Sequence, residues 1–245
     1  MGIIYRFDIR NETFEYSTFE DLEKLHNYHD IVWIDCQNNQ LHKLPTLPNN
    51  LVHLNCYNNK LTVLPTLPNS LTHLVCNCNK LEFLPNLPSS LFYFRCDNNN
   101  LKMLSRLPKS LTYLVCSQNK LIVLPILPNS LIQLYCYSNK IILLPTLPNS
   151  LTHLYCYSNN LSFIPKFSDS LILKYYFDNP VDTYIRDKYD GNLEIYHREN
   201  EIFATKLVRW YLDCRENPTF KFCRTRLNRD YDALMDEDAS GIMVD

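Results

Sequence analysis

Glycine is scarce in this chain: only three of its 245 residues are glycine. The phosphate-binding loops of many nucleotide-dependent enzymes need several glycines at fixed spacing, because their backbone bends tightly around the phosphates. Gly2, Gly191 and Gly241 form no such pattern. The sequence therefore excludes nucleotide-binding enzymes of the Rossmann and P-loop types.

Long hydrophobic runs are also missing. No segment approaches the roughly 18 consecutive apolar residues of a membrane helix. The first residues, MGIIYRFDIR, carry Arg6 and Asp8 within their apolar stretch, so we expect no signal peptide. With 46% apolar residues and a net charge of -2, the chain is predicted to fold around a core without any membrane. We expect an intracellular, cytoplasmic protein.

A twenty-residue repeat fills the middle of the chain. Seven blocks align without gaps over residues 31–170, and a degenerate eighth block begins at Leu171. Their shared form is L-x-x-L-x-C-x-x-N-x-L-x-x-L-P-x-L-P-x-S. The predicted organisation is an N-terminal cap at 1–30, a repeat array at 31–180, and a helical C-terminal cap with a frayed acidic tail at 181–245.

The physical form of one repeat follows from its alternation. Leu54 and Cys56 point to one side of an extended chain, whereas His53, Asn55 and Tyr57 point to the other, which predicts a short strand. Copies of this strand stack in parallel at about 4.8 Å. The two prolines of LPxLP lack an amide hydrogen, so the return segment is expected to be extended rather than helical.

The repeat resembles the leucine-rich repeat, with Cys at a position usually held by an aliphatic residue. Its short length and LPxLP ending are similar to the repeats of bacterial type III effectors. Its Cys, Asn and Lys bias resembles still more the leucine-rich repeat proteins of mimivirus-type giant viruses. The resemblance covers residues 31 to about 180. It implies a solenoid with parallel strands on the concave face, extended segments on the convex face, and binding of a partner protein.

Asparagine recurs at the turn that leaves each strand. A buried amide there can bond to main-chain groups of its own repeat and of the next one. We expect this structural ladder to consist of Asn39, Asn59, Asn79, Asn99, Asn119, Asn139 and Asn159, with Asn179 of the degenerate eighth block continuing it.

Cysteine recurs with the same period, which is neither zinc-ligand spacing nor a short disulfide framework. We predict a ladder of reduced core thiols, and a ladder that binds a soft metal or senses oxidation is the alternative. No metal and no cofactor are predicted. The ladder consists of Cys36, Cys56, Cys76, Cys96, Cys116, Cys136 and Cys156.

Residues that the repeat does not constrain point outward from the strands and are rich in aromatic side chains. Rigid aromatic rings lose little entropy on docking, so this concave face is predicted to bind a partner protein. The alternative is that neighbouring tyrosines only stack to stabilise the strands. The predicted contact residues are Trp33, His53, Tyr57, His73, Tyr93, Arg95, Tyr113, Tyr135, Tyr137, His153, Tyr155 and Tyr157.

His53 and His73 lie one repeat apart in the same column. Such a pair could share a metal ion, but without a matching carboxylate or thiol we interpret it as incidental. It could also make binding depend on pH, since both rings would become charged below about pH 6.5.

Charge is unevenly distributed. Residues 31–170 contain ten basic and four acidic residues, a balance of +6. Lys60, Lys80, Lys120 and Lys140 form a row beside the tyrosines, which would suit single-stranded nucleic acid. Ten basic residues over such a length are few for that role, so we interpret the row as a solubilising edge and expect no nucleic-acid partner.

Both caps carry local signals. IIYRFDI and TFEY predict a hairpin, and Ser17 with Glu20 predicts a capping box that opens a helix through about residue 27. Asn179-Pro180 and Asn217-Pro218 predict helix starts. A helical stripe is predicted between them, at Phe203, Leu207, Trp210 and Cys214.

Some effectors of the resembling family carry a ubiquitin ligase domain with a catalytic Cys in a C-x-D motif. Cys214-Arg215-Glu216 and Cys223-Arg224-Thr225 do not match that motif, and the segment after the array is short, so no enzyme is predicted.

The favoured function is a non-enzymatic scaffold that binds a partner protein, a host protein if the viral resemblance holds. The alternatives are an adapter that recruits ubiquitination machinery through its C-terminal helices, a single-stranded nucleic-acid binder, and a purely structural component of a viral particle or viral factory.

Overall fold

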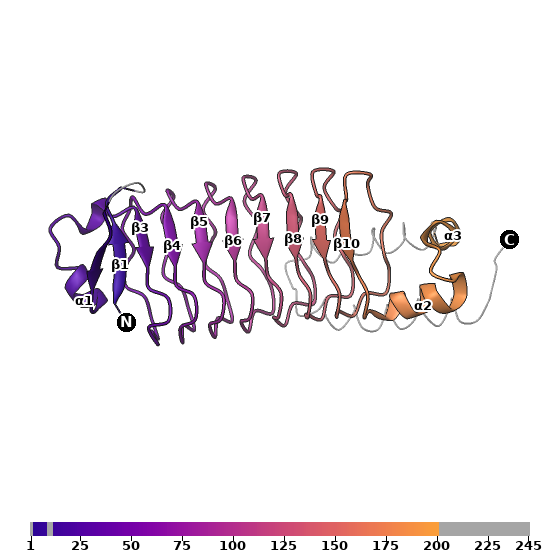
Figure 1. Cartoon of the computed structure of the whole chain (residues 1–245), viewed down its shortest axis with the longest axis horizontal. Coiled ribbons are helices and arrows are strands. Elements are labelled where there is room, and N and C mark those ends of the chain that lie inside the picture. Colours follow the sequence, from indigo (N-terminus) through magenta and orange to yellow (C-terminus); the bar gives the residue numbers. More distant parts are fainter. Residues whose placement is uncertain (1, 9–11, 201–245) are drawn as a thin grey trace. The chain divides into compact units, whose positions relative to one another are not determined.

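The computed structural model describes residues 2–8 and 12–200 of the chain. They form a ten-stranded sheet, in which the strands from β3 to β10 lie side by side in sequence order (Figure 1). The compact unit that holds the sheet spans residues 1–196, and a second unit spans residues 197–245, most of which lie outside the described residues. Among the described residues, no helix combines the length and the apolar character needed to cross a membrane.

Eight short parallel strands build the array. Equivalent residues pair directly, so that His53 pairs with His73 and Tyr135 pairs with Tyr155. The solenoid of short parallel strands that the repeat predicts is confirmed. The strands are β3 (Trp33–Asp35), β4 (His53–Asn55), β5 (His73–Val75), β6 (Tyr93–Arg95), β7 (Tyr113–Val115), β8 (Gln133–Tyr135), β9 (His153–Tyr155) and β10 (Leu173–Tyr175).

The core consists of straight ladders that run along the solenoid. The middle residue of a strand, such as Leu54 or Phe94, is fully buried, and so is the Cys that follows the strand. Successive coils are joined by backbone hydrogen bonds: the Cys56 amide donates to the Val75 carbonyl at 2.8 Å. Because a coil buries its side chains against its neighbours, stability is a property of the array and not of one repeat.

The return half of each coil is extended. Between β3 and β10, all of it within the described part, the chain contains no helix (Figure 1). The two prolines of LPxLP explain this, because they cannot donate the backbone hydrogen bonds that a helix requires.

The Asn at the ninth position of each repeat connects neighbouring coils. The Asn119 Nδ2 group donates to the carbonyl oxygens of Cys96 at 3.0 Å, Cys116 at 3.1 Å and Ser117 at 3.1 Å. Its Oδ1 atom accepts from the Leu101 amide at 3.0 Å. Equivalent contacts are made by Asn59, Asn79, Asn99, Asn139, Asn159 and Asn179.

The turn after each strand contains a residue in the left-handed region, with φ between 50° and 59°. Glycine adopts this conformation at the lowest cost, yet none of these turns contains it. Four of the eight residues are Asn or Asp, which tolerate the conformation better than other side chains. Hydrogen bonds from the Asn ladder hold the turns in place. The eight residues are Asn38, Asn58, Cys78, Asn98, Gln118, Ser138, Ser158 and Asp178.

Serine at the end of the repeat forms a second polar ladder, which the sequence analysis did not assign. The Ser90 hydroxyl lies 2.7 Å from the Asn69 carbonyl oxygen and 2.6 Å from that of Leu71. Ser70, Ser110 and Ser130 make the same contacts. These serines link each turn to the coil before it.

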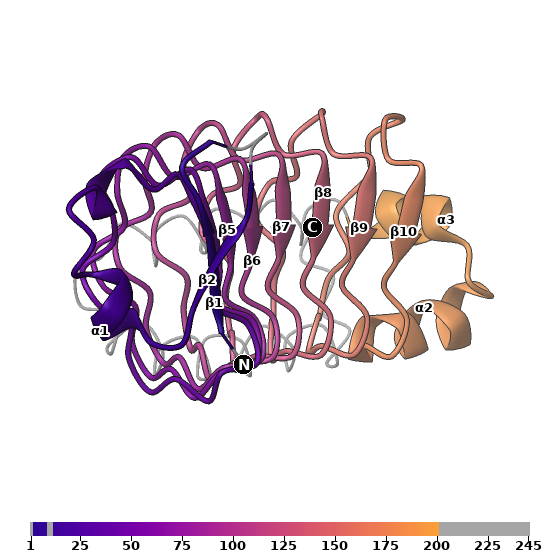
Figure 2. The same cartoon turned by 60° about the vertical axis from the view of Figure 1, so that its left-hand side comes forward.

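The N-terminal cap covers the first strand edge. β1 (Ile3–Arg6) and β2 (Phe14–Tyr16) form an antiparallel hairpin (Figure 2), and β1 also pairs antiparallel with β3. A 3-10 helix, η1 (Tyr28–Asp30), leads into the array. Asn39 Nδ2 donates to the Gly2 carbonyl at 3.2 Å, so the cap supplies a partner that a preceding coil supplies elsewhere. The predicted hairpin cap is confirmed.

The helix in this cap differs from the prediction. A capping box of Ser17 and Glu20 with a helix through residue 27 is wrong: α1 spans only Phe19–Leu22, and Thr18 caps it. Thr18 Oγ1 accepts from the Asp21 amide at 3.3 Å and donates to Asp21 Oδ2 at 2.8 Å. Thr18 and Asp21, one residue after the predicted pair, form the cap because the Thr18 hydroxyl bonds both the backbone amide and the carboxylate of Asp21.

Two helices follow β10: α2 (Pro180–Tyr189) and α3 (Leu193–Glu199). The predicted helical C-terminal cap and its start at Asn179-Pro180 are therefore present. The Asn179 side chain, however, does not cap α2. It donates to the Cys156 carbonyl at 3.1 Å and accepts from the Leu161 amide at 2.9 Å, as a member of the Asn ladder.

The cap covers the return half of the last coils. Tyr196 of α3 is buried, its ring contacts Phe163, and its hydroxyl accepts from the Ile164 amide at 3.4 Å. Lys174, in the middle of β10, is exposed, although the middle residue of each parallel strand from β3 to β9 is buried. The predicted Asn217-Pro218 helix start and the stripe at 203–214 lie outside the described residues.

The Asn ladder predicts a stability effect. Replacing Asn119 by Asp exchanges a donor for an acceptor, so three carbonyls lose their donor inside the core. We expect the free energy of unfolding to fall by about 3 kcal/mol or more. Urea and thermal unfolding measure the loss. Asn160→Asp, at an exposed position two repeats after that of Asn119, is the matched control and should change stability little. Equal losses of stability in both variants would contradict the role of the ladder.

The Cys ladder predicts selective labelling. Burial raises the pKa of all seven ladder thiols, that of Cys156 to about 12, so they stay protonated at neutral pH and react slowly. Cys78 is only half-buried. Among the cysteines of the described part, iodoacetamide should modify native Cys78 alone. Mass spectrometry of the peptides, with a urea-unfolded sample as the fully labelled reference, checks this, and rapid labelling of Cys76 would contradict it.

Candidate protein-binding surface

All twelve predicted contact residues lie on the outward side of the parallel strands, which we call the sheet face. Each of them is half-buried, so part of every side chain reaches solvent. The sheet pairing places them in the third, fifth and seventh positions of successive repeats.

Eight rings form a continuous line along the sheet face, which we call the aromatic ridge. Neighbouring ring centroids lie 4.5 to 5.7 Å apart. Strand spacing imposes these contacts, because paired residues on parallel neighbours sit about 4.8 Å apart. The line passes from the third to the fifth position between β7 and β8. Its members are Trp33, His53, His73, Tyr93, Tyr113, Tyr135, Tyr155 and Tyr175.

A second line, which we call the tyrosine column, consists of Tyr137, Tyr157 and Phe177. The rings lie 4.6 and 4.8 Å apart and are nearly parallel, with interplanar angles of 3° and 9°. The sequence analysis missed Tyr175 and Phe177, which end the two lines and are 41% and 50% exposed. Their distance of twenty residues from Tyr155 and Tyr157 was the signal that could have found them.

The two ends of the aromatic ridge differ. At the N-terminal end the Arg6 guanidinium carbon lies 4.5 Å from the centroid of the Trp33 ring. At the other end Tyr175 stands on the last strand of the sheet and is exposed.

Three predicted residues lie outside both lines. Arg95 Nε lies 3.3 Å from Asp97 Oδ1, and Asn77 Nδ2 donates to Asp97 Oδ2 at 3.3 Å, so this carboxylate is compensated within the face. His153 Nδ1 lies 2.7 Å from the hydroxyl of the preceding Thr. Tyr57 has no ring neighbour within the described part. The second acid of the sheet face, Asp35, accepts from Asn55 Nδ2 at 3.0 Å.

The histidine pair is part of the aromatic ridge. The ring centroids of His53 and His73 lie 5.4 Å apart. Thr72 Oγ1 donates to the Val52 carbonyl at 3.1 Å, which leaves it to accept from His73 Nδ1 at 2.9 Å. Within the described residues no group of three or more His, Cys, Asp or Glu side chains is placed to hold a metal ion.

Both histidines are hard to protonate. Burial, helped by the charges of His73 and Arg6, lowers the pKa of His53 to about 4, and burial lowers the pKa of His73. The expectation that both rings become charged below about pH 6.5 is therefore wrong for His53, and the pKa of His73 shifts in the same direction. The reason is that stacking between neighbouring rings removes water from the imidazoles.

A pH effect on stability follows instead. The unfolded chain binds a proton at His53 near pH 6.5, whereas the folded chain binds it only near pH 4, so stability should fall as the pH drops through that window. His53→Gln should lose part of this slope. Urea unfolding between about pH 4 and 7 measures it. His42→Gln, at an exposed position, is the control, and identical slopes in all three proteins would contradict the assignment.

No protein-family model matches the chain, and no curated protein matches it. Solved structures do match. YopM from Yersinia enterocolitica WA-314 is similar with a TM-score of 0.59 and 36% identity, over 59% of this chain and 32% of that chain. A Shigella effector LRR domain is similar with a TM-score of 0.58 and 30% identity, over 65% of this chain and 77% of that chain.

This chain thus spans about a third of the first neighbour and about three quarters of the second. The likeness to bacterial leucine-rich repeat effectors that the repeat suggests is present, and the giant-virus likeness stays a prediction. Leucine-rich repeat domains with this architecture serve as scaffolds for protein interaction. From its repeat, its parallel solenoid and its likeness to the Shigella domain, the chain belongs to the leucine-rich repeat proteins.

Proposed function

We propose that this protein is a non-enzymatic scaffold that binds a partner protein on its sheet face. The observation that carries the proposal is the aromatic ridge, which places eight rings in contact across eight successive strands. Rings that are already fixed by their neighbours lose little entropy when a partner docks. The face therefore combines a large contact area with a small ordering cost.

The stacking interpretation and the binding interpretation are compatible. Each stacked pair contributes roughly 0.5 to 1.5 kcal/mol beyond the area that it buries. That contribution explains why rings follow one another along the sheet. It does not require the ends of the lines to be exposed, and Tyr175 and Phe177 are 41% and 50% exposed. Their exposure favours a surface that is completed by a partner.

We extend the proposal to an intracellular site of action and a host partner. The likeness to a Shigella effector domain supports a role on the proteins of another organism. The eight cysteines of the described part are all free, seven of them stacked in one ladder, which suits a reducing compartment. A viral source is part of the same hypothesis.

Catalysis has no place in this proposal. The ladder thiols are buried and their pKa values are raised, so they are poor nucleophiles. The adapter hypothesis places a second partner on the C-terminal helices, and the part of those helices beyond residue 200 lies outside the described residues.

Photo-cross-linking tests the sheet face directly. A benzophenone amino acid in place of Tyr155 should cross-link one protein partner in expressing cells, because Tyr155 lies within the aromatic ridge. Adding Tyr135→Ala or Tyr137→Ala should reduce the yield at least about tenfold, since truncation of a central aromatic contact costs on the order of 2 kcal/mol, roughly thirtyfold in affinity. Thermal melting verifies that each variant stays folded.

The matched control carries the same benzophenone in place of Ile126, which is 56% exposed outside the strands. It should give no cross-link to this partner. Equal yields from Tyr155 and Ile126, or a yield that the alanine substitutions leave unchanged, would mean that the partner does not use the sheet face.

A further inference from the structure

The stacked rings present their edges, not their flat faces, to solvent. Tyr137 and Tyr157 are nearly parallel at 4.6 Å, and so are Tyr135 and Tyr155 at 4.5 Å. At this distance each ring covers the flat face of its neighbour. An aromatic ring carries negative charge on its face and positive charge at its edge, so the accessible part of these stacks is electropositive.

The hydroxyl groups at the ring edges are available as donors. Tyr135 donates to Gln133 Oε1 at 3.2 Å. Within the described part, the hydroxyls of Tyr137, Tyr155 and Tyr157 have no protein partner. Burial raises the pKa of Tyr135 and Tyr157, so these phenols stay protonated at neutral pH. Such a row of hydroxyls offers hydrogen bonds to an acceptor-rich ligand.

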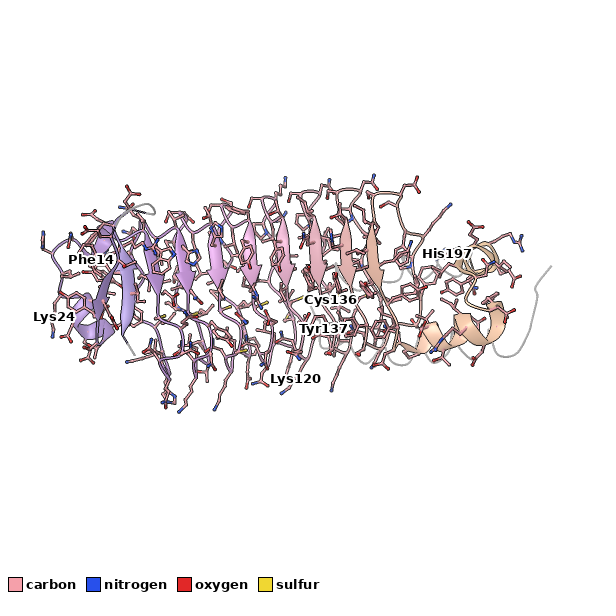
Figure 3. The ribbon with its side chains drawn as sticks, viewed as in Figure 1. Phe14, Lys24, Lys120, Cys136, Tyr137 and His197 are labelled. Atoms are coloured by element: carbon pink, nitrogen blue, oxygen red, sulfur yellow. The ribbon has the colours of Figure 1, made fainter. Side chains whose placement is uncertain are left out.

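A positive edge borders the tyrosine column. We call Lys60, Lys80, Lys120 and Lys140 the lysine rim. Lys120 extends from the edge where the strands end, and Tyr137 lies between the strands and that edge (Figure 3). The turns of the seven full repeats that contain the rim, at positions eight to ten, include no acidic residue.

The acids on or beside the sheet face accept hydrogen bonds from neighbouring side chains. Asp178, exposed in the turn after Phe177, accepts from Ser158 Oγ at 2.6 Å. Asp35 and Asp97, the two acids in the third, fifth and seventh positions, are held by Asn55 and by Arg95 with Asn77. Both lie before β7. From β7 to β10 these positions carry no charge, only rings, small polar groups and aliphatic side chains.

We propose that the tyrosine column and the lysine rim recognise an extended acidic segment of the partner protein. Carboxylates would accept hydrogen bonds from the Tyr137 and Tyr157 hydroxyls and pair with Lys120 and Lys140. This inference rests on the proposed function, since it names the chemistry of the partner that the sheet face binds. Complementary charge of this kind steers association and selects the partner.

The same geometry disfavours two other ligands. Arginine or lysine of a basic peptide would need an open ring face for a cation–π contact, and the stacks cover those faces. Bases of a single-stranded nucleic acid also stack on open ring faces. Within the two lines only the end rings offer one, and Tyr57, outside the lines, is another sheet-face ring without a ring neighbour in the described part.

Fluorescence anisotropy with the full chain tests the inference. The probes are three labelled dodecapeptides in which alanine alternates with glutamate, glutamine or lysine, together with an oligothymidylate of equal length. We expect the glutamate peptide to bind at least about tenfold more tightly than the glutamine peptide, the lysine peptide not to bind, and added salt to weaken the glutamate complex.

Two double variants locate the site. Lys120→Glu with Lys140→Glu should lower the affinity for the glutamate peptide at least about tenfold. Tyr137→Phe with Tyr157→Phe keeps the stacked rings, removes the hydroxyls, and should lower the affinity by about the same factor. Arg106→Glu with Lys109→Glu is the control: it makes the same charge change at exposed positions of a return segment. It should alter affinity less than about twofold.

Several results would overturn the inference. One is equal affinity for the glutamate and glutamine peptides. Another is an equal loss of affinity in the lysine-rim variant and in the control variant, which would mean that only the net charge of the protein matters. Tighter binding of the oligothymidylate, weakened by the rim variant, would assign the surface to nucleic acid. If no peptide binds while Tyr155 still cross-links its partner, the acidic segment is wrong and the proposed scaffold function stands.

Discussion

The structure depends on the contact of the ladder Asn with the coil before its own. One such side chain, Asn119, satisfies carbonyls of two successive coils and the amide of Leu101. Since a single repeat cannot bury its own apolar side chains, each coil needs its neighbours at fixed height and register. The buried amide sets that register, because a shift would leave several backbone groups without partners. It also holds turns whose left-handed residues are not glycine.

Fixed register has a direct effect on the outer face. When equivalent residues of parallel strands are neighbours, a ring in one repeat meets a ring in the next, as Tyr135 meets Tyr155. The core thus determines the arrangement of the surface. It produces a rigid row of aromatic side chains and covers their flat faces. What a partner meets is a set of ring edges and hydroxyls with lysines beside them, which has a different chemical preference from isolated tyrosines.

The first and last coils of the array each lack a neighbouring repeat on one side, and other elements take its place. At the start, β1 pairs with β3 and the Gly2 carbonyl accepts from Asn39, so the hairpin replaces a missing coil. At the other end the helices cover the return half of the last coils through Tyr196. On β10 of the sheet, Lys174 stands where earlier strands bury an apolar residue. At the C-terminal end, helices therefore cover the return side of the coils, whereas the strand side ends with an exposed lysine.

Sequence alone determined the parallel solenoid, the extended return segments, the inward Leu and Cys and the outward aromatic residues. With a strict period of twenty residues, stacking equivalent coils in register both buries the apolar side chains and pairs the backbone hydrogen-bonding groups. Sequence alone did not reveal the short helix capped by Thr18, that Asn179 serves the Asn ladder without capping α2, or the low pKa of His53. These depend on which groups meet across coils and on how much water they lose. Only the tertiary structure decided that the rings form one continuous line. Between Tyr113 and Tyr135 the aromatic ridge changes from the third to the fifth position of the repeat. The twenty-residue period does not predict that contact, because it depends on how far the two side chains extend.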